Sequence, residues 1–204
     1  MKLKNLEMAL QRLSGYARPS PTLEQYQTPA PLAARLLYTA FMNHDIEGKR
    51  VCDLGSGTGV LAIGAALLGA AKVTGVELDD AAIKTATANA ALLGAEVDFI
   101  VGDIRDTTIA ERLGTFDTVV MNPPFGAQNA HADRPFIDCA LRIAPVTYGI
   151  FNAGSTQFVD TFIRDRATIT GQIAGKFPIR RTFFFHTKEV QEIEVEILRL
   201  TRRK

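Results

Sequence analysis

The fold is decided by the stretch Asp53-Leu54-Gly55-Ser56-Gly57-Thr58-Gly59, which follows one apolar run and precedes another. Glycines at such a turn let the backbone approach a ligand closely and adopt φ angles that a side chain forbids. A dinucleotide site places its third glycine three positions after the second, but here the third follows after two. The carboxylate of Asp53 can accept hydrogen bonds from an ammonium group. The stretch therefore predicts a strand, a turn and a helix that hold a cationic ligand without phosphates; the alternative is a tight turn with no ligand.

Outward from this turn, strand-like and helix-like segments alternate along the chain. Such alternation produces a parallel, doubly wound sheet with helices on both faces. Two strand-like runs near the C-terminus leave little room for a helix between them, which favours an antiparallel hairpin. We therefore expect an α/β, Rossmann-like fold with a mostly parallel seven-stranded sheet and a C-terminal antiparallel hairpin. The expected strands are 50–54, 72–77, 96–102, 116–121, 148–151, 181–186 and 192–200, and the expected helices include 32–42, 59–68 and 81–93.

One domain is expected across residues 1–204, because no internal repeat, low-complexity tract or change in composition divides the chain. Leucines recur at helical spacing between positions 3 and 13, which predicts a short amphipathic helix that packs on the main body. Four prolines between positions 19 and 31 interrupt the stretch that follows. Residues 1–31 are thus expected to supply an N-terminal helix and a loop that covers the cofactor and the substrate.

The composition is that of a soluble globular protein, with 47% hydrophobic and 22% charged residues. No apolar run reaches the roughly 20 residues that span a bilayer. No apolar stretch follows the basic residues at the N-terminus, so we expect a cytoplasmic protein without a membrane association. The 23 Lys and Arg nearly balance the 22 Asp and Glu, which leaves no global field to attract a polyanion. Two cysteines and three scattered histidines predict neither a disulfide framework nor a metal site.

Two acids lie where later strands are expected to end. Glu77 follows the glycines by about 20 residues, the position at which an acid binds both hydroxyls of a ribose. Asp103 ends the third expected strand, where its carboxylate can accept a hydrogen bond from an adenine amine. Because the carboxyl ends of parallel strands line one crevice, both acids and their neighbours Leu78 and Ile104 are expected at the cofactor site. The competing interpretation is that the acids only cap helices.

The fourth expected strand is followed by Asn122-Pro123-Pro124-Phe125. Proline restricts its own φ and the conformation of the residue before it, so the Asn122 side chain and the Pro123 carbonyl are held rigidly. Two such acceptors can bind the hydrogens of an adenine amine and localise its lone pair toward an activated methyl group, without a strong base. Phe125 offers a face on which an unpaired base can stack. The alternative is a proline-rich turn with Phe125 in the core.

Together, the glycine turn and the Asn-Pro-Pro-Phe loop resemble the Rossmann-like methyltransferases that modify amino groups and use S-adenosylmethionine (SAM). The narrower resemblance is to the small archaeal and eukaryotic family that methylates an adenine N6 in small-subunit ribosomal RNA. It rests on residues 23–28, on Phe125-Gly126, on Phe185-His186 and on the strand 193–196, and it covers nearly the whole chain.

The resemblance assigns roles to individual residues. It implies that Gln25, Tyr26 and Thr28 close over the methionine part of SAM. The rest of the cofactor site is implied to consist of Asp53, Gly55, Gly57, Gly59, Glu77, Leu78, Asp103, Ile104 and Asn122. The implied catalytic residues, which hold the adenine, are Asn122, Pro123, Pro124 and Phe125.

The expected function is therefore transfer of a methyl group from SAM to the N6 amine of an adenine in RNA, with small-subunit ribosomal RNA as the substrate. Eukaryotic members of the family work with a small zinc-binding activator protein, so the resemblance implies such a partner. These members carry a His-Lys pair where this chain has Asn152-Ala153, which leaves an RNA contact at that point open. Two alternatives stay open: a protein glutamine-N5 methyltransferase, whose amide also presents an NH2 group, and a non-catalytic ribosome assembly factor that binds SAM and RNA.

Overall fold

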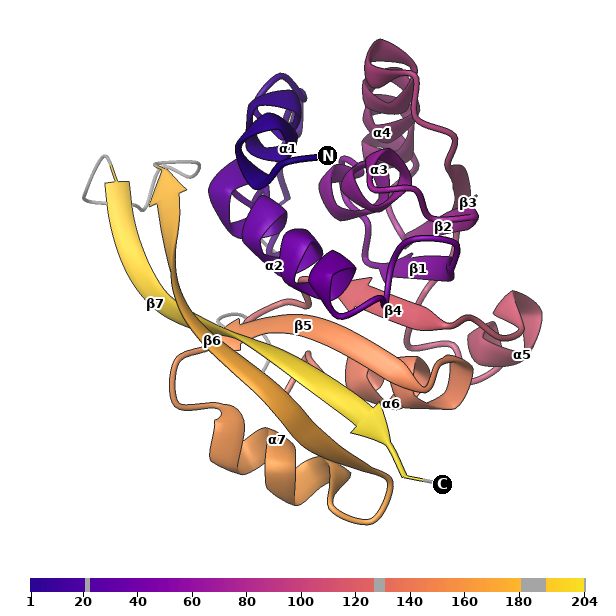
Figure 1. Cartoon of the computed structure of the whole chain (residues 1–204), viewed down its shortest axis with the longest axis vertical. Helices are drawn as coiled ribbons and strands as arrows, with labels where there is room; N and C mark the ends of the chain where they lie inside the picture. Colours follow the sequence, from indigo (N-terminus) through magenta and orange to yellow (C-terminus); the bar gives the residue numbers. More distant parts are fainter. Residues whose placement is uncertain (21–22, 127–130, 181–189, 204) are drawn as a thin grey trace.

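A computed structural model describes residues 1–20, 23–126, 131–180 and 190–203 of the chain. Within these residues the centre is a seven-stranded sheet with the order β3-β2-β1-β4-β5-β7-β6 (Figure 1). Strands β1 to β5 pair in parallel, whereas β7 pairs antiparallel with β5 and β6. The expected Rossmann-like fold is confirmed. The strands are β1 (Arg50–Leu54), β2 (Lys72–Glu77), β3 (Asp98–Val101), β4 (Thr118–Met121), β5 (Val146–Asn152), β6 (Ala167–Arg180) and β7 (Val190–Arg202).

Helices lie on both faces of this sheet (Figure 1). They are α1 (Leu3–Leu10), α2 (Ala30–Met42), α3 (Val60–Leu67), α4 (Asp80–Leu93), α5 (Ile109–Leu113), α6 (Arg134–Ile143) and α7 (Thr156–Ile163). Pro29 and Pro31 flank the first residue of α2, where a missing N–H costs nothing because the first turn has no acceptors for it. Across the described part of the chain, no helix combines the length and apolar character that crossing a membrane requires.

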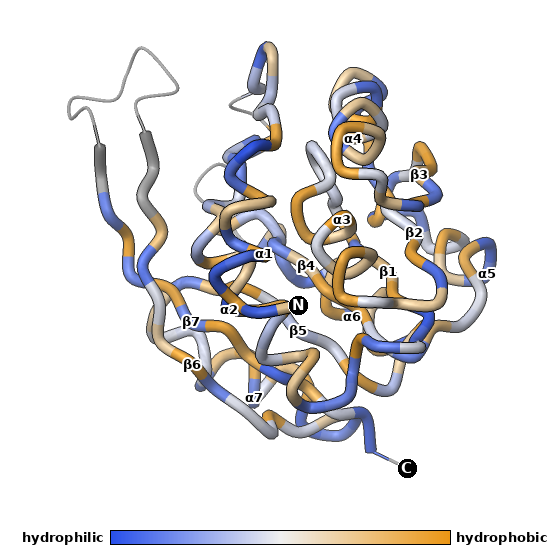
Figure 2. Tube along the Cα trace, turned by 45° about the horizontal axis from the view of Figure 1, so that its top comes forward, coloured by the Kyte–Doolittle hydropathy of each residue, from blue (hydrophilic) through white to orange (hydrophobic). Residues whose placement is uncertain are grey.

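Side chains of the central strands alternate between two hydrophobic cores, one on each face of the sheet. Val51 and Val120 belong to the core that contains residues of α1, α2 and α3. Cys52 and Met121 belong to the core that contains residues of α5, α6 and α7. Successive residues of a strand point to opposite faces, so each strand serves both cores. Figure 2 shows hydrophobic residues in the central strands and in α3, and hydrophilic residues at the C-terminal end.

Most expected elements lie close to their expected places. Strands β1 and β2 have the expected bounds, and α1 packs on the body with Leu6 and Leu10 buried. Strand β3 is shorter than expected, and α5, α6 and α7 had not been assigned from the sequence.

The expected C-terminal hairpin is confirmed, but the strand that pairs with β7 was not assigned from the sequence. The strand that pairs with β7 is β6, whereas the expected strand 181–186 lies outside the described residues. Strand β6 contains Gly171, Gly175 and Pro178, and its register shifts between Ile169 and Gly171. These residues interrupt the apolar alternation on which a strand prediction depends. An edge strand tolerates them because one of its sides needs no ladder hydrogen bonds.

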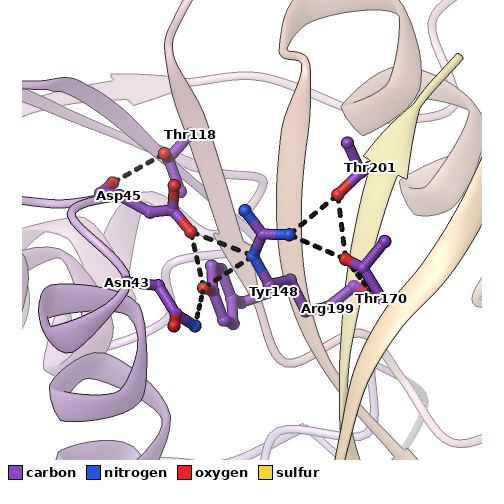
Figure 3. Close-up of polar contacts among 7 residues, drawn as sticks. All are labelled: Asn43, Asp45, Thr118, Tyr148, Thr170, Arg199 and Thr201. Atoms are coloured by element: carbon purple, nitrogen blue, oxygen red, sulfur yellow. Dashed lines mark hydrogen bonds and ion pairs between the residues drawn. The ribbon is translucent and has the colours of Figure 1, made fainter.

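A partly buried polar network joins this hairpin to the rest of the sheet (Figure 3). The Tyr148 hydroxyl donates to Asp45 Oδ2 at 2.6 Å, and Arg199 Nε donates to the same oxygen at 3.0 Å. The Thr118 hydroxyl donates to the Asp45 carbonyl at 2.6 Å, which ties the chain after α2 to the first residue of β4. The outer members are Asn43, Thr170 and Thr201. Burial and the hydrogen bond to Asp45 raise the pKa of Tyr148 to about 12, so its hydroxyl stays a donor.

Candidate functional site

A cavity of about 300 Å³ lies at the carboxyl ends of β1 to β4. Open parallel sheets bind ligands at this edge, and the volume is at the lower end of the range for ligand pockets. Of the residues expected at the site, Gly57 and Gly59 do not line the cavity. The expected residues that do line it are Gln25, Tyr26, Thr28, Asp53, Gly55, Glu77, Leu78, Asp103, Ile104, Asn122, Pro123, Pro124 and Phe125. Their roles in binding and catalysis stay predictions.

The glycine turn has the backbone that its composition predicts. Gly55, Gly57 and Gly59 have φ angles of 71°, 53° and 87°, which side-chain-bearing residues rarely adopt. A Cβ at Gly55 would lie 2.8 Å from the Phe136 ring, so a larger residue would require that ring to move. The turn therefore depends on glycine for both its conformation and its packing.

Asp53 is almost completely buried, with 1% of its surface exposed. Its Oδ2 accepts the backbone N–H of Ala62 at 2.9 Å, whereas Oδ1 has no partner among the described residues. Burial raises the pKa of Asp53 to about 7; the bond from Ala62 opposes this shift, and the charge of Glu77 adds to it. A cationic group beside Oδ1 would stabilise the ionised form of Asp53. The ammonium ligand predicted from the sequence would be such a group.

Glu77 ends β2 and is held by three backbone donors. Its Oε2 accepts from Gly57 N at 2.8 Å, while Oε1 accepts from Leu78 N at 2.8 Å and Asp79 N at 2.9 Å. The carboxylate therefore has one fixed orientation, and it joins the glycine turn to the end of β2. Oε2 accepts one of these bonds and keeps a lone pair that the ribose hydroxyls can share.

Asp103 lines the cavity but is paired with a neighbouring residue. Arg105 Nε donates to Asp103 Oδ1 and Oδ2 at 2.9 and 3.1 Å, and Arg105 Nη2 donates to Oδ2 at 2.7 Å. The hydrogen bonds from Arg105 lower the pKa of Asp103. The carboxylate is thus oriented and ionised. Arg105 N also donates to Oδ1, so an amine donor would have to share these oxygens with Arg105.

The expected covering loop is tied to the cavity at several points. Gln25 Nε2 donates to Asp79 Oδ2 at 2.8 Å, and Gln25 Oε1 accepts from Ser20 N at 2.7 Å. Asn122 Nδ2 donates to the Thr28 hydroxyl oxygen at 3.0 Å. The loop therefore packs over both the expected cofactor site and the expected catalytic loop. The bond to Thr28 also fixes which way the Asn122 amide points.

The Asn-Pro-Pro-Phe loop follows β4 directly and is fixed at its far end too. Gly126 N donates to Glu24 Oε2 at 3.1 Å, and Asn152 Nδ2 donates to the Phe125 carbonyl at 3.3 Å. The Phe125 ring meets the Phe177 ring edge to face at a centroid distance of 5.5 Å. Asn152, which stands where the resemblance would place a basic pair, therefore supports the loop.

Polar atoms without partners gather at this cavity. Among the described residues, seven buried side-chain nitrogen or oxygen atoms have no hydrogen-bond partner. Four of these belong to residues that line the cavity: Asp53 Oδ1, Ser56 Oγ, Thr58 Oγ1 and Asn122 Oδ1. Buried polar groups in native proteins nearly always have partners, so this concentration indicates a ligand that supplies them. Buried acids, glycine backbone and apolar neighbours fit SAM, which carries an ammonium group, ribose hydroxyls and an adenine.

Several other residues that line the cavity were not predicted from sequence patterns, among them Tyr16, Phe136 and Phe177. Each comes from an element outside the motifs: Tyr16 from the chain after α1, Phe136 from α6 and Phe177 from β6. Long-range packing brings these aromatic residues to the site, and no local spacing marks them.

Comparisons with known proteins extend over the same residues. Residues 31–142 match the family model of the methyltransferase small domain. An uncharacterized protein of Methanocaldococcus jannaschii is 40% identical over 210 residues, which cover 99% of this chain and 95% of that protein. The rRNA N(6)-adenosine-methyltransferase Mettl5 of Drosophila melanogaster is 34% identical over 206 residues, which cover 98% of this chain and 96% of that protein. The crystal structure of a candidate RNA methyltransferase from Pyrococcus horikoshii has a TM-score of 0.91 and 39% identity, with 100% of this chain and 99% of that chain covered.

These matches are not confined to the glycine turn and its helix. The family model includes β1 to β4, and both sequence relatives continue through the C-terminal hairpin. The expected enzyme class, a methyltransferase that uses SAM, is confirmed. The chain belongs to the methyltransferase small domain family, in the group that includes the rRNA N(6)-adenosine-methyltransferase Mettl5.

Proposed function

We propose that this chain transfers a methyl group from SAM to the N6 amine of an adenine in ribosomal RNA, and that the RNA is that of the small subunit. The carrying observation is Asn122 Oδ1, a buried acceptor without a partner at the carboxyl end of β4. The Drosophila melanogaster relative supports the choice of an adenine in rRNA, because it matches 98% of this chain and is an rRNA N(6)-adenosine-methyltransferase.

The cofactor would be held by the acids at the strand ends. Asp53 Oδ1 would accept from the ammonium group, Glu77 from the ribose hydroxyls and Asp103 from the adenine amine of SAM. When bound, SAM supplies a methyl group on a sulfonium, which is activated for transfer to a weak nucleophile. Gln25 is anchored to Asp79 and would cover the methionine part together with Tyr26.

The target adenine would be held by the Asn122 loop. Because Asn122 Nδ2 donates to Thr28, Oδ1 is the atom left to accept from the N6 amine. The Pro123 carbonyl would accept the second amine hydrogen. These two acceptors would localise the nitrogen lone pair, and the amine proton would leave to water after transfer, so no strong base is required. Phe125 would stack on the adenine ring.

A small zinc-binding activator protein is the partner that we propose, as the family resemblance implies. The near balance of 23 basic and 22 acidic residues supports it, because such a chain has no strong field of its own for a polyanion. A partner that adds basic surface would raise the affinity for structured RNA and steepen its salt dependence.

The test is transfer of a labelled methyl group from SAM to separate substrates: small-subunit rRNA, large-subunit rRNA and a purified translation release factor. Label is expected in the small-subunit rRNA with the wild type and not with Asn122→Ala. Asn5→Ala makes the same change at an exposed position of α1 and should keep full transfer. Label in the release factor alone would replace this proposal with glutamine methylation. Label in the RNA that Asn122→Ala does not reduce would remove Asn122 from the mechanism.

A further inference from the structure

Tyr16 is an aromatic residue of the cavity to which the motifs assign no role. It lies in the chain between α1 and the covering loop, and its side chain reaches the glycine turn. A Cβ on Gly57 would collide with the Tyr16 hydroxyl oxygen. The hydroxyl therefore sits directly against the backbone of the turn that the cofactor approaches.

Asn89 of α4 fixes the position of this segment relative to the glycine turn. Its Oδ1 accepts from Ser14 N at 2.9 Å, and its Nδ2 donates to the carbonyls of Ser14 and Thr58, each at 2.9 Å. Ser14 is two residues before Tyr16, and Thr58 directly follows Gly57. Only 2% of the surface of Asn89 is exposed, so its side chain is a buried hydrogen-bonded link, the Asn89 clamp, between the segment before Tyr16 and the glycine turn.

The Tyr16 hydroxyl has acids around it but no hydrogen bond to any described residue. Burial, followed by the charges of Glu77, Asp53 and Asp79, raises its pKa, so the oxygen keeps its proton at neutral pH. It is therefore a fixed, neutral donor that faces the cavity without an acceptor of its own.

The charges that line the cavity leave one part of SAM without a matching group. Among the described lining residues, Arg105 is the basic one, and its side chain already donates three hydrogen bonds to Asp103. The amino-acid part of SAM carries a carboxylate as well as an ammonium group. Asp53 and Glu77 would repel a bare carboxylate. The bound ammonium group therefore has to offset their charge, and neutral donors have to bind the carboxylate.

We infer that the Tyr16 hydroxyl donates a hydrogen bond to the carboxylate of the amino-acid part of the cofactor, which makes Tyr16 a cofactor-binding residue. This inference rests on the proposed cofactor site. It also explains the Asn89 clamp, because a donor that is placed before the ligand arrives loses little entropy on binding.

The test is calorimetric binding of two probes to the full chain. S-adenosylhomocysteine carries the amino-acid carboxylate, and 5′-methylthioadenosine lacks the amino-acid part. Tyr16→Phe is expected to weaken S-adenosylhomocysteine binding about 10- to 100-fold, the usual effect of losing a hydrogen bond to a charged group, and to leave 5′-methylthioadenosine binding unchanged. Tyr38→Phe, which changes a tyrosine of α2 outside the cavity, is the matched control and should change neither.

Three results would overturn the inference. Equal S-adenosylhomocysteine affinity in wild type and Tyr16→Phe would show that the hydroxyl makes no cofactor contact. An equal loss for both probes would show that Tyr16 acts on the adenosine part or only through packing, and a melting curve of the variant would identify a folding defect. If the wild type bound neither probe, the proposed cofactor site itself would be wrong, and the inference would fail with it.

Discussion

Two polar clusters lie at opposite ends of β4, and they differ in whether their atoms have partners. At the amino end, Asp45, Tyr148 and Arg199 bond to one another, and the Asp45 carbonyl accepts from the Thr118 hydroxyl (Figure 3). At the carboxyl end, Asn122 leaves its Oδ1 without a partner among the described residues. At about 3.3 Å per residue, the four residues of β4 separate these ends by roughly 13 Å.

The difference separates groups that stabilise the fold from groups that bind a ligand. A buried polar group whose partner is another part of the chain contributes to stability, and losing the partner costs stability. A buried polar group without such a partner costs stability, and binding is what compensates for it. Four predictions follow the comparison from the largest expected effect to the smallest.

Asn122→Ala should reduce single-turnover methyl transfer to rRNA by about 10²–10³-fold, because it removes one preorganised polar contact of the reaction. Cofactor affinity should stay near normal. The free energy of unfolding should change by less than about 1 kcal/mol, because removing the unpartnered Oδ1 offsets part of the cost of losing the bond from Nδ2 to Thr28. Urea denaturation and calorimetry on the same preparation check both points. A large loss of stability would instead show that the Asn122 side chain stabilises the fold.

Asp45→Ala should have the opposite effect: a loss of stability without a loss of cofactor affinity. It leaves the Tyr148 hydroxyl and Arg199 Nε without their shared acceptor, which should lower the free energy of unfolding by about 2 kcal/mol in urea denaturation. Cofactor affinity should be unchanged. The control is Asp160→Ala on the exposed side of α7, which should cost less than about 0.5 kcal/mol. Equal effects of the two substitutions would contradict a stabilising role for the network.

Thr28→Val should have an intermediate effect at the catalytic end. The hydroxyl oxygen that accepts from Asn122 Nδ2 is lost, so the amide is no longer held with Oδ1 toward the substrate. The rate at saturating cofactor should fall about tenfold, corresponding to one hydrogen bond of about 1.4 kcal/mol. If cofactor affinity fell instead while the rate held, Thr28 would act on SAM and not on Asn122.

The smallest expected effect is on the pH dependence of cofactor binding. The pKa of Asp53 is raised to about 7 in the folded protein, mainly by burial, so the carboxyl holds its proton to a higher pH than an exposed acid does. A ligand ammonium requires the ionised form, and calorimetric affinity should therefore rise about fivefold from pH 6 to pH 7. Asp53→Asn should bind more weakly and without this dependence. Affinity that fell over the same interval would contradict the assignment of Asp53.

Local patterns in the sequence predicted β1, β2 and the glycine turn between β1 and α3 well. Strands β1 and β2 have the expected bounds: each begins with an exposed basic residue, is buried after it, and carries an acid at or next to its last position. The glycine turn follows β1, Glu77 is the last residue of β2 and Asn122 follows β4, so their places in the fold are set by short-range sequence.

Other parts of the molecule depend on contacts between distant segments and were missed. Strand β6 is interrupted by Gly171, Gly175 and Pro178, and its pairing with β7 is what maintains it. Tyr16 reaches the cavity because Asn89, 75 residues after Ser14, holds the segment before it. Nor does any spacing bring Asp45 to Arg199, which is 154 residues away.

The most direct test of the central claim is the identity of the methylated nucleoside. Small-subunit rRNA would be incubated with SAM and either the wild type or Asn122→Ala, then digested and examined by mass spectrometry. The account predicts N6-methyladenosine with the wild type and none above background with the variant. A different methylated nucleoside, or equal amounts of N6-methyladenosine from both proteins, would contradict it.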